Sequence, residues 1–442
     1  MKLLKIHLRY HPPGIILEYS RKATEPLLTE DVRVQLEECL TTLKTRLEHE
    51  GPAGKRYYLY KTLLTHILPL TNVCFDKHGK RVLTGSYDRT CRVWDADTGA
   101  EVATLAGHQN VVYSVGFNTS LCDRVVTGSF DKTSKIWDPT TGVCLATLWG
   151  HNGEVVAAEF SPKGDFVVTA SMDHLAKLFD ANTGTEVQTF AGHTAEVVSL
   201  QLDPNDDRRL VTGSFDTTVA LWDTRQPERV CELRGHCGEI SGVRLNWDGR
   251  LVGSASLDGS ARLWDARERA CLATAQDHAG EVLDVCFDWA GARLATCSGD
   301  GSARVYDVTD FRELAVMRGH REEVSKVCFS PAGGCLLTAS ADRSARIWNA
   351  STGNCLQVLS GHEGEIFSCA FSYAGDAVVT ASKDNTCRTA LNIMSSVCNR
   401  KLMMIELCVS EREDSLHSSQ CLALSLNICT GANSGTRGRA KR

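Results

Sequence analysis

The sequence predicts an all-β protein in which eight copies of one four-stranded unit form a closed or radially repeated body. A histidine recurs every 42 or 43 residues, and Ser, Asp and an aromatic residue follow it at nearly constant distances. Short alternating apolar segments and turn residues fill each period. A period of this length marks a supersecondary unit that cannot bury its apolar face alone, so neighbouring copies must pack together.

The same four positions mark every copy, with the Ser two residues before the Asp and the aromatic residue six residues after it. The histidines are His66, His108, His151, His193, His236, His278, His320 and His362. The serines are Ser86, Ser129, Ser171, Ser214, Ser256, Ser298, Ser340 and Ser382. The aspartates are Asp88, Asp131, Asp173, Asp216, Asp258, Asp300, Asp342 and Asp384. The last position holds Trp94, Trp137, Phe179, Trp222, Trp264, Tyr306, Trp348 and, in the eighth copy, Ala390.

The copy that begins at Gly319 shows how one period divides into four strands. Residues 323–329 alternate with period two, and a Pro- and Gly-containing turn follows them. Residues 336–340, 344–348 and 355–359 are three further short apolar segments with turns between them. Short strands at even spacing predict a closed or radially repeated all-β fold.

Gly-His near the start and Trp-Asp near the end of a repeat, as in Gly107-His108 and Trp137-Asp138, resemble the WD-repeat family. The resemblance covers residues 56–388 and implies an eight-bladed β-propeller of four-stranded blades. Residues 57–64 predict a lone fourth strand. In such a propeller this strand would complete the last blade and leave no open edge.

The recurring Ser, His and Asp also suggest a hydrolase triad. A nucleophile needs one strained and exposed position, whereas these residues occur in eight equivalent copies without a Gly-x-Ser-x-Gly elbow. The WD-family resemblance implies a structural network instead, in which Asp bonds His, His bonds the strand Ser, and Ser bonds Trp. Each bond would contribute about 0.5–1.5 kcal/mol. We therefore predict no catalytic residues, and no cofactor or metal.

Three blades depart from this pattern. Phe179 has no donor to close its network, and Tyr306 offers a hydroxyl in place of an indole. Thr65 and Asp277 replace the glycine that precedes the histidine. We expect blades one, three and six to be less regular.

Composition narrows the class of protein. The chain has 442 residues, 43% of them hydrophobic, and a net charge of −6 without a basic stripe, so we expect no nucleic-acid partner. Long apolar segments and a signal peptide are absent from the sequence, so we expect a soluble, intracellular protein without a membrane partner, and a monomer. Eight of the 19 cysteines recur at two repeat positions, and we predict reduced, packed thiols rather than disulfides or a metal site. The first set is Cys74, Cys286, Cys328 and Cys369, and the second is Cys144, Cys231, Cys271 and Cys355.

A glutamate follows the histidine by three residues in six copies. In a propeller these positions would lie near one rim of the central channel and form an acidic arc with a neutral sector at Pro69 and Val111. One interpretation pairs each Glu with a base two residues before the aromatic position. The other makes the arc a docking site for a basic partner. The glutamates are Glu154, Glu196, Glu239, Glu281, Glu323 and Glu365, and the bases are Lys135, Lys177, Arg262, Arg304, Arg346 and Arg388.

The first 55 residues predict a small α+β module. Apolar stretches lie within residues 3–19, and residues 26–50 predict an amphipathic helix with Val32, Leu36 and Leu40 on one face. This face must dock, either against the propeller or in a dimer. We favour the propeller and expect a second candidate binding site in the groove between the two parts.

The C-terminal end breaks the repeat. Thr389-Ala390 stand where the period requires Ile-Trp, and the following residues contain neither Gly-His nor Trp-Asp. Losing a buried Trp costs roughly 3–5 kcal/mol, so we expect weaker ring closure. We interpret residues 389–442 as a disordered, divergent tail that comes from an alternative or mispredicted exon, or has a role of its own.

The N-terminal segment, the amphipathic helix and residues 68–73 ahead of eight repeats resemble the WD-repeat subfamily of assembly factors for outer-arm axonemal dynein. The resemblance implies a non-enzymatic adaptor with axonemal dynein subunits and an intraflagellar transport subunit as partners. It also implies a place in the cytoplasm, the basal body and the cilium or flagellum. The alternative is another WD-repeat adaptor, such as a ubiquitin-ligase substrate receptor.

Overall fold

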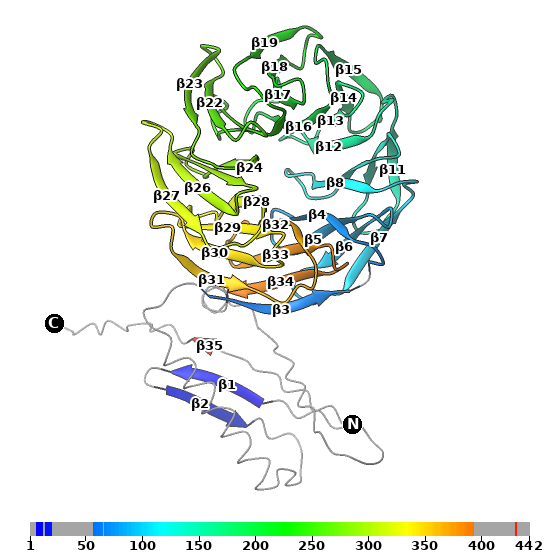
Figure 1. Ribbon diagram of the computed structural model, residues 1–442. Helices are drawn as coiled ribbons and strands as arrows, with labels where there is room; N and C mark the ends of the chain where they lie inside the picture. The colour runs from blue at the N-terminus through cyan, green and yellow to red at the C-terminus, as the bar shows by residue number, and fades with distance from the viewer. Residues whose placement is uncertain (1–5, 12–13, 20–55, 65, 393–428, 431–442) are drawn as a thin grey trace, which may run out of the picture. The chain divides into compact units, whose positions relative to one another are not determined.

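The computed structural model describes residues 6–11, 14–19, 56–64, 66–392 and 429–430. Every regular element in these ranges is a β-strand, and the chain divides into two units. One unit is residues 57–391, and the other combines residues 1–56 with 392–442. The larger unit is a ring of eight four-stranded sheets (Figure 1). The predicted all-β, eight-bladed propeller is therefore confirmed.

Each sheet, or blade, extends outward from an innermost strand, and seven of the eight are antiparallel meanders of four consecutive strands. Blade one consists of β4 (Leu70–Phe75), β5 (Arg81–Ser86), β6 (Thr90–Asp95) and β7 (Glu101–Ala106). Its strands pair in chain order, with a register shift in β4 between Leu70 and Asn72. The same shift recurs at the start of every innermost strand. Repetition of one bulge shows that all eight blades share one backbone plan.

The other blades follow the same order, each from its innermost strand outward. Blade two is β8 (Val112–Phe117), β9 (Val125–Ser129), β10 (Ser134–Trp137) and β11 (Cys144–Leu148), and blade three is β12 (Val155–Phe160), β13 (Phe166–Ser171), β14 (Leu175–Asp180) and β15 (Glu186–Ala191). Blade four is β16 (Val197–Leu202), β17 (Arg209–Ser214), β18 (Val219–Asp223) and β19 (Arg229–Leu233), and blade five is β20 (Ile240–Leu245), β21 (Leu251–Ser256), β22 (Ala261–Asp265) and β23 (Ala270–Ala275). Blade six is β24 (Val282–Phe287), β25 (Arg293–Ser298), β26 (Ser302–Asp307) and β27 (Glu313–Arg318), and blade seven is β28 (Val324–Phe329), β29 (Cys335–Ser340), β30 (Ala345–Asn349) and β31 (Cys355–Leu359). Blade eight is β32 (Ile366–Phe371), β33 (Ala377–Ser382), β34 (Cys387–Asn392) and β3 (Tyr57–Leu63).

The core lies between neighbouring blades. All five residues of β9 are buried, because both faces of a second strand pack against adjacent sheets. The fourth strand β11 buries only Leu148 completely, since one of its faces meets solvent. Trp137, Trp222 and Trp348 are among the largest fully buried side chains, and each packs between two blades. Successive copies thus complete each other's cores, as the repeat period requires.

The ring closes where the first strand of the larger unit meets the last blade. Strand β3 pairs with β34 as the outermost strand of blade eight (Figure 1), which confirms the predicted closure. Ser368 donates to Asn72 Oδ1 at 2.9 Å and so joins blades eight and one near the channel. The Tyr57 hydroxyl donates to the Gly375 carbonyl at 2.8 Å. Blade eight therefore contains segments from both ends of the repeat array.

The predicted boundary at residue 388 falls inside the last strand of the repeat array. Strand β34 continues to Asn392, so Thr389 and Ala390 form part of blade eight rather than of a tail. In the smaller unit, β1 (Ile6–His11) and β2 (Gly14–Tyr19) pair antiparallel, and β35 (Cys429–Thr430) pairs parallel with β1. The predicted helix over residues 26–50, its apolar face and the rest of the tail lie outside the described residues.

The cysteines behave differently at the two repeat positions. All cysteines within residues 56–392 are free. Cys369 is buried and Cys74, Cys286 and Cys328 are half-buried, as expected for packed thiols on innermost strands. The prediction of packed thiols is wrong for the second set, because outermost strands turn one face to solvent. In that set Cys144, Cys271 and Cys355 are exposed and Cys231 is half-buried.

Candidate functional site

In each complete blade, a network of four side chains joins the loop before the innermost strand, the second strand, the turn after it and the third strand. In blade four, His193 Nδ1 lies 2.8 Å from Asp216 Oδ2, and His193 Nε2 lies 2.8 Å from Thr212 Oγ1. Trp222 Nε1 donates to the same Thr212 oxygen at 2.8 Å. Over the eight blades the Nδ1–Oδ2 distance is 2.7–3.1 Å and the Nε2–Oγ distance is 2.7–2.9 Å. The network recurs with nearly constant geometry.

The hydroxyl in this network is not the predicted serine. It belongs to the residue two positions earlier on the same strand, because alternate side chains of a strand share one face and the earlier one lies beside the His and Trp rings. The complete networks are His66–Thr84–Trp94 with Asp88, His108–Thr127–Trp137 with Asp131, His193–Thr212–Trp222 with Asp216, His236–Ser254–Trp264 with Asp258, and His320–Thr338–Trp348 with Asp342. A hydroxyl four residues before each Asp also recurs in the sequence and marks this position as a second candidate beside the serine.

The predicted serines instead hold the turn that follows the second strand. The Asp88 N–H donates to Ser86 Oγ at 3.0 Å, and Ser86 donates to the carbonyl oxygens that precede β4. The turn residue after the Asp adopts a left-handed conformation, with φ of 70° at Arg89. The same N–H to Oγ bond is made to Ser129, Ser214, Ser256 and Ser340. These serines orient the aspartate, and the tryptophan N–H donates to the other hydroxyl of the strand.

The irregular blades differ only at the aromatic end. His151 keeps both of its bonds in blade three, although Phe179 offers no donor. In blade six the Tyr306 hydroxyl donates to Asp277 Oδ2 at 3.2 Å, so the residue that replaces glycine becomes its partner. His66 in blade one has the same contacts as its equivalents. The backbone of these blades keeps the common strand order, contrary to the expected irregularity.

Burial favours the neutral form of five network histidines by lowering their pKa values. Burial lowers the pKa of His236, although Asp258 raises it. The pKa of Asp173 is lowered to about 2 in spite of burial, because His151 and backbone N–H groups donate to its carboxylate. A carboxylate can only accept, so Nδ1 carries the imidazole proton and Nε2 accepts from the hydroxyl. The four side chains satisfy one another's hydrogen-bonding groups, as expected of a network with a structural role.

We expect the melting temperature to fall as the pH is lowered from about 7.5 to about 5.5. Burial holds the pKa of His193, His278, His320 and His362 below the ordinary value of 6.5. The unfolded chain then binds more protons than the folded one, so stability begins to fall once the pH drops below that value. Scanning calorimetry over this range measures the effect, and an unchanged melting temperature would contradict it.

The six predicted glutamates occupy one rim of the ring. Each lies immediately before an innermost strand, and its carbonyl accepts the N–H of the residue that follows the turn serine, as from Leu257 to Glu239 at 2.9 Å. Glu239, Glu281 and Glu323 are exposed, while Glu154, Glu196 and Glu365 are half-buried. Equivalent backbone bonds place all six on the same rim.

The predicted pairing of these glutamates with the recurring bases is wrong. Lys177 pairs with Glu186 at 2.7 Å, and Arg304 pairs with Glu313. Lys135 donates to Thr147 and Arg262 contacts Cys271, also on outermost strands. The bases point away from the channel because they lie on third strands, next to the fourth. Of the six rim glutamates, only Glu365 forms an ion pair with another described residue, namely Lys383 at 2.9 Å.

The neutral sector of the rim is apolar. Tyr87 and Phe130 occupy the position after the turn serine, and their N–H groups bond the carbonyls of Pro69 and Val111. The rings of Tyr113 and Phe130 stack with their centroids 5.2 Å apart. Tyr87 is 42% and Tyr113 43% exposed. This aromatic sector of blades one and two therefore interrupts the acidic arc.

Two other features, a metal site and a membrane-spanning helix, are not found in the described residues. These residues contain no group of three or more His, Cys, Asp or Glu side chains placed to bind a metal. Nor do they include a helix with the length and apolarity needed to cross a membrane.

Comparison with known proteins gives three findings. The family of the WD domain, G-beta repeat, matches eight segments of the chain, at 58–95, 99–138, 142–180, 184–223, 227–265, 269–307, 311–349 and 353–389. The chain is 47% identical over 151 residues to "Dynein assembly factor with WD repeat domains 1" of Danio rerio, and 46% identical to the protein of the same name from Homo sapiens. Each match covers 28% of this chain and 36% of the relative, so the matched part spans about a third of those proteins.

A similar architecture occurs among solved structures. The crystal structure of the computationally designed Ika8 protein superimposes with a TM-score of 0.67 at 28% sequence identity. It covers 76% of this chain and all of the designed one. Eight matched repeats and eight observed blades agree in number, and each matched repeat combines the fourth strand of one blade with the first three strands of the next. The chain therefore belongs to the WD domain, G-beta repeat family.

Proposed function

We propose that this protein is a non-enzymatic scaffold that binds outer-arm axonemal dynein and couples it to intraflagellar transport during ciliary assembly. The similarity to proteins named dynein assembly factor carries the proposal. A propeller with saturated polar networks and an open rim supports it, because such a body presents surfaces rather than a reactive group. The protein would act as a monomer in the cytoplasm, at the basal body and in the cilium or flagellum.

The rim is the surface that we assign to a partner. The acidic arc attracts positive charge, and exposed glutamates such as Glu239 and Glu281 have no ion-pair partner among the described residues. The adjacent aromatic sector offers Tyr87 and Tyr113 as apolar contacts. Aromatic groups beside charged ones are typical of binding surfaces. A fitting partner presents basic residues and one apolar anchor.

Charge reversal by Glu239→Lys, Glu281→Lys and Glu323→Lys together should abolish binding of the basic partner and leave the melting temperature within a few degrees. The reason is that these side chains are exposed and contribute little to the core. Affinity for purified dynein subunits measures the effect.

A matched control reverses three acidic residues in turns between third and fourth strands, at the opposite end of the strands. Glu228→Lys, Glu268→Lys and Asp310→Lys make the same change in net charge at exposed positions. The control should keep its affinity. Unchanged binding by the rim variant would reject the rim as the docking site.

Co-purification from ciliated cells tests the function itself. The tagged protein should recover axonemal dynein heavy chains and an intraflagellar transport subunit. Recovery of ubiquitin-ligase subunits without dynein would contradict the proposal and favour a substrate receptor.

A further inference from the structure

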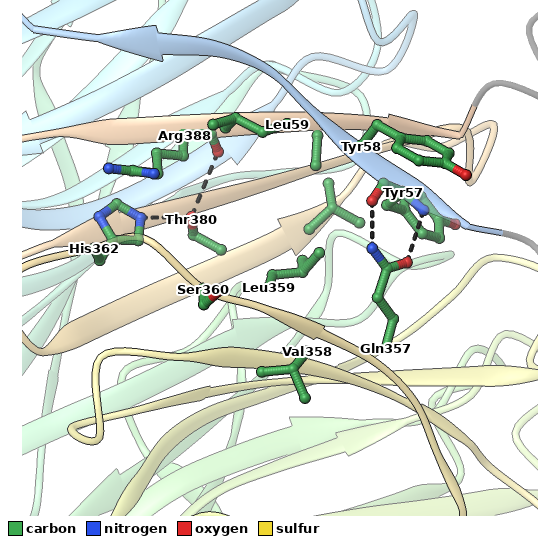
Figure 2. A pocket seen from close by; sticks show the side chains of 12 residues that line it. Tyr57, Tyr58, Leu59, Gln357, Val358, Leu359, Ser360, His362, Thr380 and Arg388 are labelled. Carbon is green, nitrogen blue, oxygen red and sulfur yellow. Dashed lines mark hydrogen bonds between the residues drawn. The ribbon is translucent and has the colours of Figure 1, made fainter. Parts of the chain in front are cut away.

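Blade eight contains a cavity at the place where its aromatic residue is missing. The cavity has a volume of about 260 Å³, and Ala390 lies on its wall. Thr380 also lies on this wall (Figure 2). The remaining lining comes from strand β3, from blade seven and from the blade-eight network. These residues are Tyr57, Tyr58, Leu59, Gln357, Val358, Leu359, Ser360, His362, Val378 and Arg388.

The wall reproduces the surroundings of a tryptophan in the preceding blade. Trp348 pairs with Leu336 in the sheet, and Ala390 pairs with Val378 in the same register. His320, Thr338 and Arg346 correspond to His362, Thr380 and Arg388, each one repeat later. Trp348 also packs with Ala315 and Met317 of blade six, whose equivalents are Gln357 and Leu359. The cavity therefore lies at the place in blade eight that the indole ring of Trp348 fills in blade seven.

The polar groups of the site are already in place. Thr380 Oγ1 lies 2.9 Å from His362 Nε2, as in the complete networks (Figure 2). In five blades an indole N–H donates to this hydroxyl at 2.8–2.9 Å. Arg346 lies 5.8 Å from the ring of Trp348, and Arg388 holds the same position beside the cavity. An incoming ring would find an acceptor for its N–H and a cation near its face.

The cavity is reachable and large enough. Its inner wall is buried, with Val378 1% and Thr380 5% exposed. Its outer lining includes Leu59, which is 56% exposed, and Val358, which is 45% exposed. An apolar cavity of roughly 150 Å³ binds benzene in another protein, so this volume admits an indole.

We propose that the blade-eight cavity binds an indole ring supplied by another molecule. The eight tryptophans of the chain lie between residues 94 and 348, and residues 393–442 contain no Trp, Tyr or Phe. The ring therefore comes from a tryptophan side chain of a partner protein or from a free indole compound. This inference does not depend on the proposed dynein function.

Titration of the full chain with indole, 1-methylindole and a blocked Ala-Trp-Ala peptide tests the site. We expect saturable binding of one indole per chain by calorimetry, about 2- to 10-fold tighter than that of 1-methylindole, which lacks the N–H. Ala390→Trp should fill the cavity from within, raise the melting temperature and abolish binding. No saturable binding to the natural chain, or equal binding by Ala390→Trp, would overturn the proposal.

Two substitutions at Thr380 separate the hydrogen bond from the shape of the cavity. Thr380→Ser keeps the hydroxyl, as Ser254 does in blade five, and should retain the preference for indole over 1-methylindole. Thr380→Val should lose that preference, and a preference equal to that of the natural chain would contradict the assigned acceptor. Tight binding of the peptide identifies a protein side chain as the source, and binding of free indole alone identifies a small molecule.

Discussion

Trp264→Ala should lower the free energy of unfolding by about 3–5 kcal/mol. The side chain of Trp264 is 2% exposed and packs between blades four and five. Its N–H donates to Ser254, which also bonds His236, so the substitution removes core volume and one end of a polar network. Chemical denaturation followed by fluorescence and circular dichroism measures the loss.

Trp149→Ala is the matched control for this substitution. Trp149 is 68% exposed, so its removal leaves no cavity and should change the free energy of unfolding by less than about 1 kcal/mol. Similar losses for the two variants would contradict the structural role assigned to the network tryptophans.

A chain that starts at residue 65 should be less stable still, because it lacks strand β3. Tyr57 is 2% and Leu63 5% exposed, and burial of two such side chains alone contributes roughly 3–6 kcal/mol. The deletion also exposes β34 as an open edge, which favours association with other chains. Thermal unfolding and size-exclusion chromatography measure the two effects.

A chain that starts at residue 56 is the control for this truncation, since it lacks the smaller unit's N-terminal segment and keeps β3. It should unfold at a higher temperature than the shorter chain and stay monomeric. Equal melting temperatures would show that β3 contributes nothing to closure.

Much of the ring could be predicted because one pattern occurs eight times. Any single Gly-His or Trp-Asp pair is weak evidence, but recurrence at a constant period defines the unit, its strands and its turns. The closing strand was predictable as well, since residues 57–64 are an apolar segment without a repeat of their own. The structure confirms this prediction, because β3 is the fourth strand of blade eight.

Side-chain partners were harder to predict. Lys177 and Arg304 were candidate partners of the rim glutamates. They pair instead with Glu186 and Glu313 on the neighbouring strand. A strand pattern tells which face a side chain occupies but not how far along that face its partner lies. The glutamates of the acidic arc therefore form fewer ion pairs than their predicted pairing with these bases required.

The sequence by itself determined the number of blades, the order of their strands and the absence of an aromatic residue at Ala390, because these depend only on spacing and residue type. Tertiary structure alone decided that Thr212 rather than Ser214 joins the His and Trp rings, because both hydroxyls share one strand face. It also decided that the missing ring leaves a cavity beside Thr380. Distances across strands and between blades arise only when distant segments pack together.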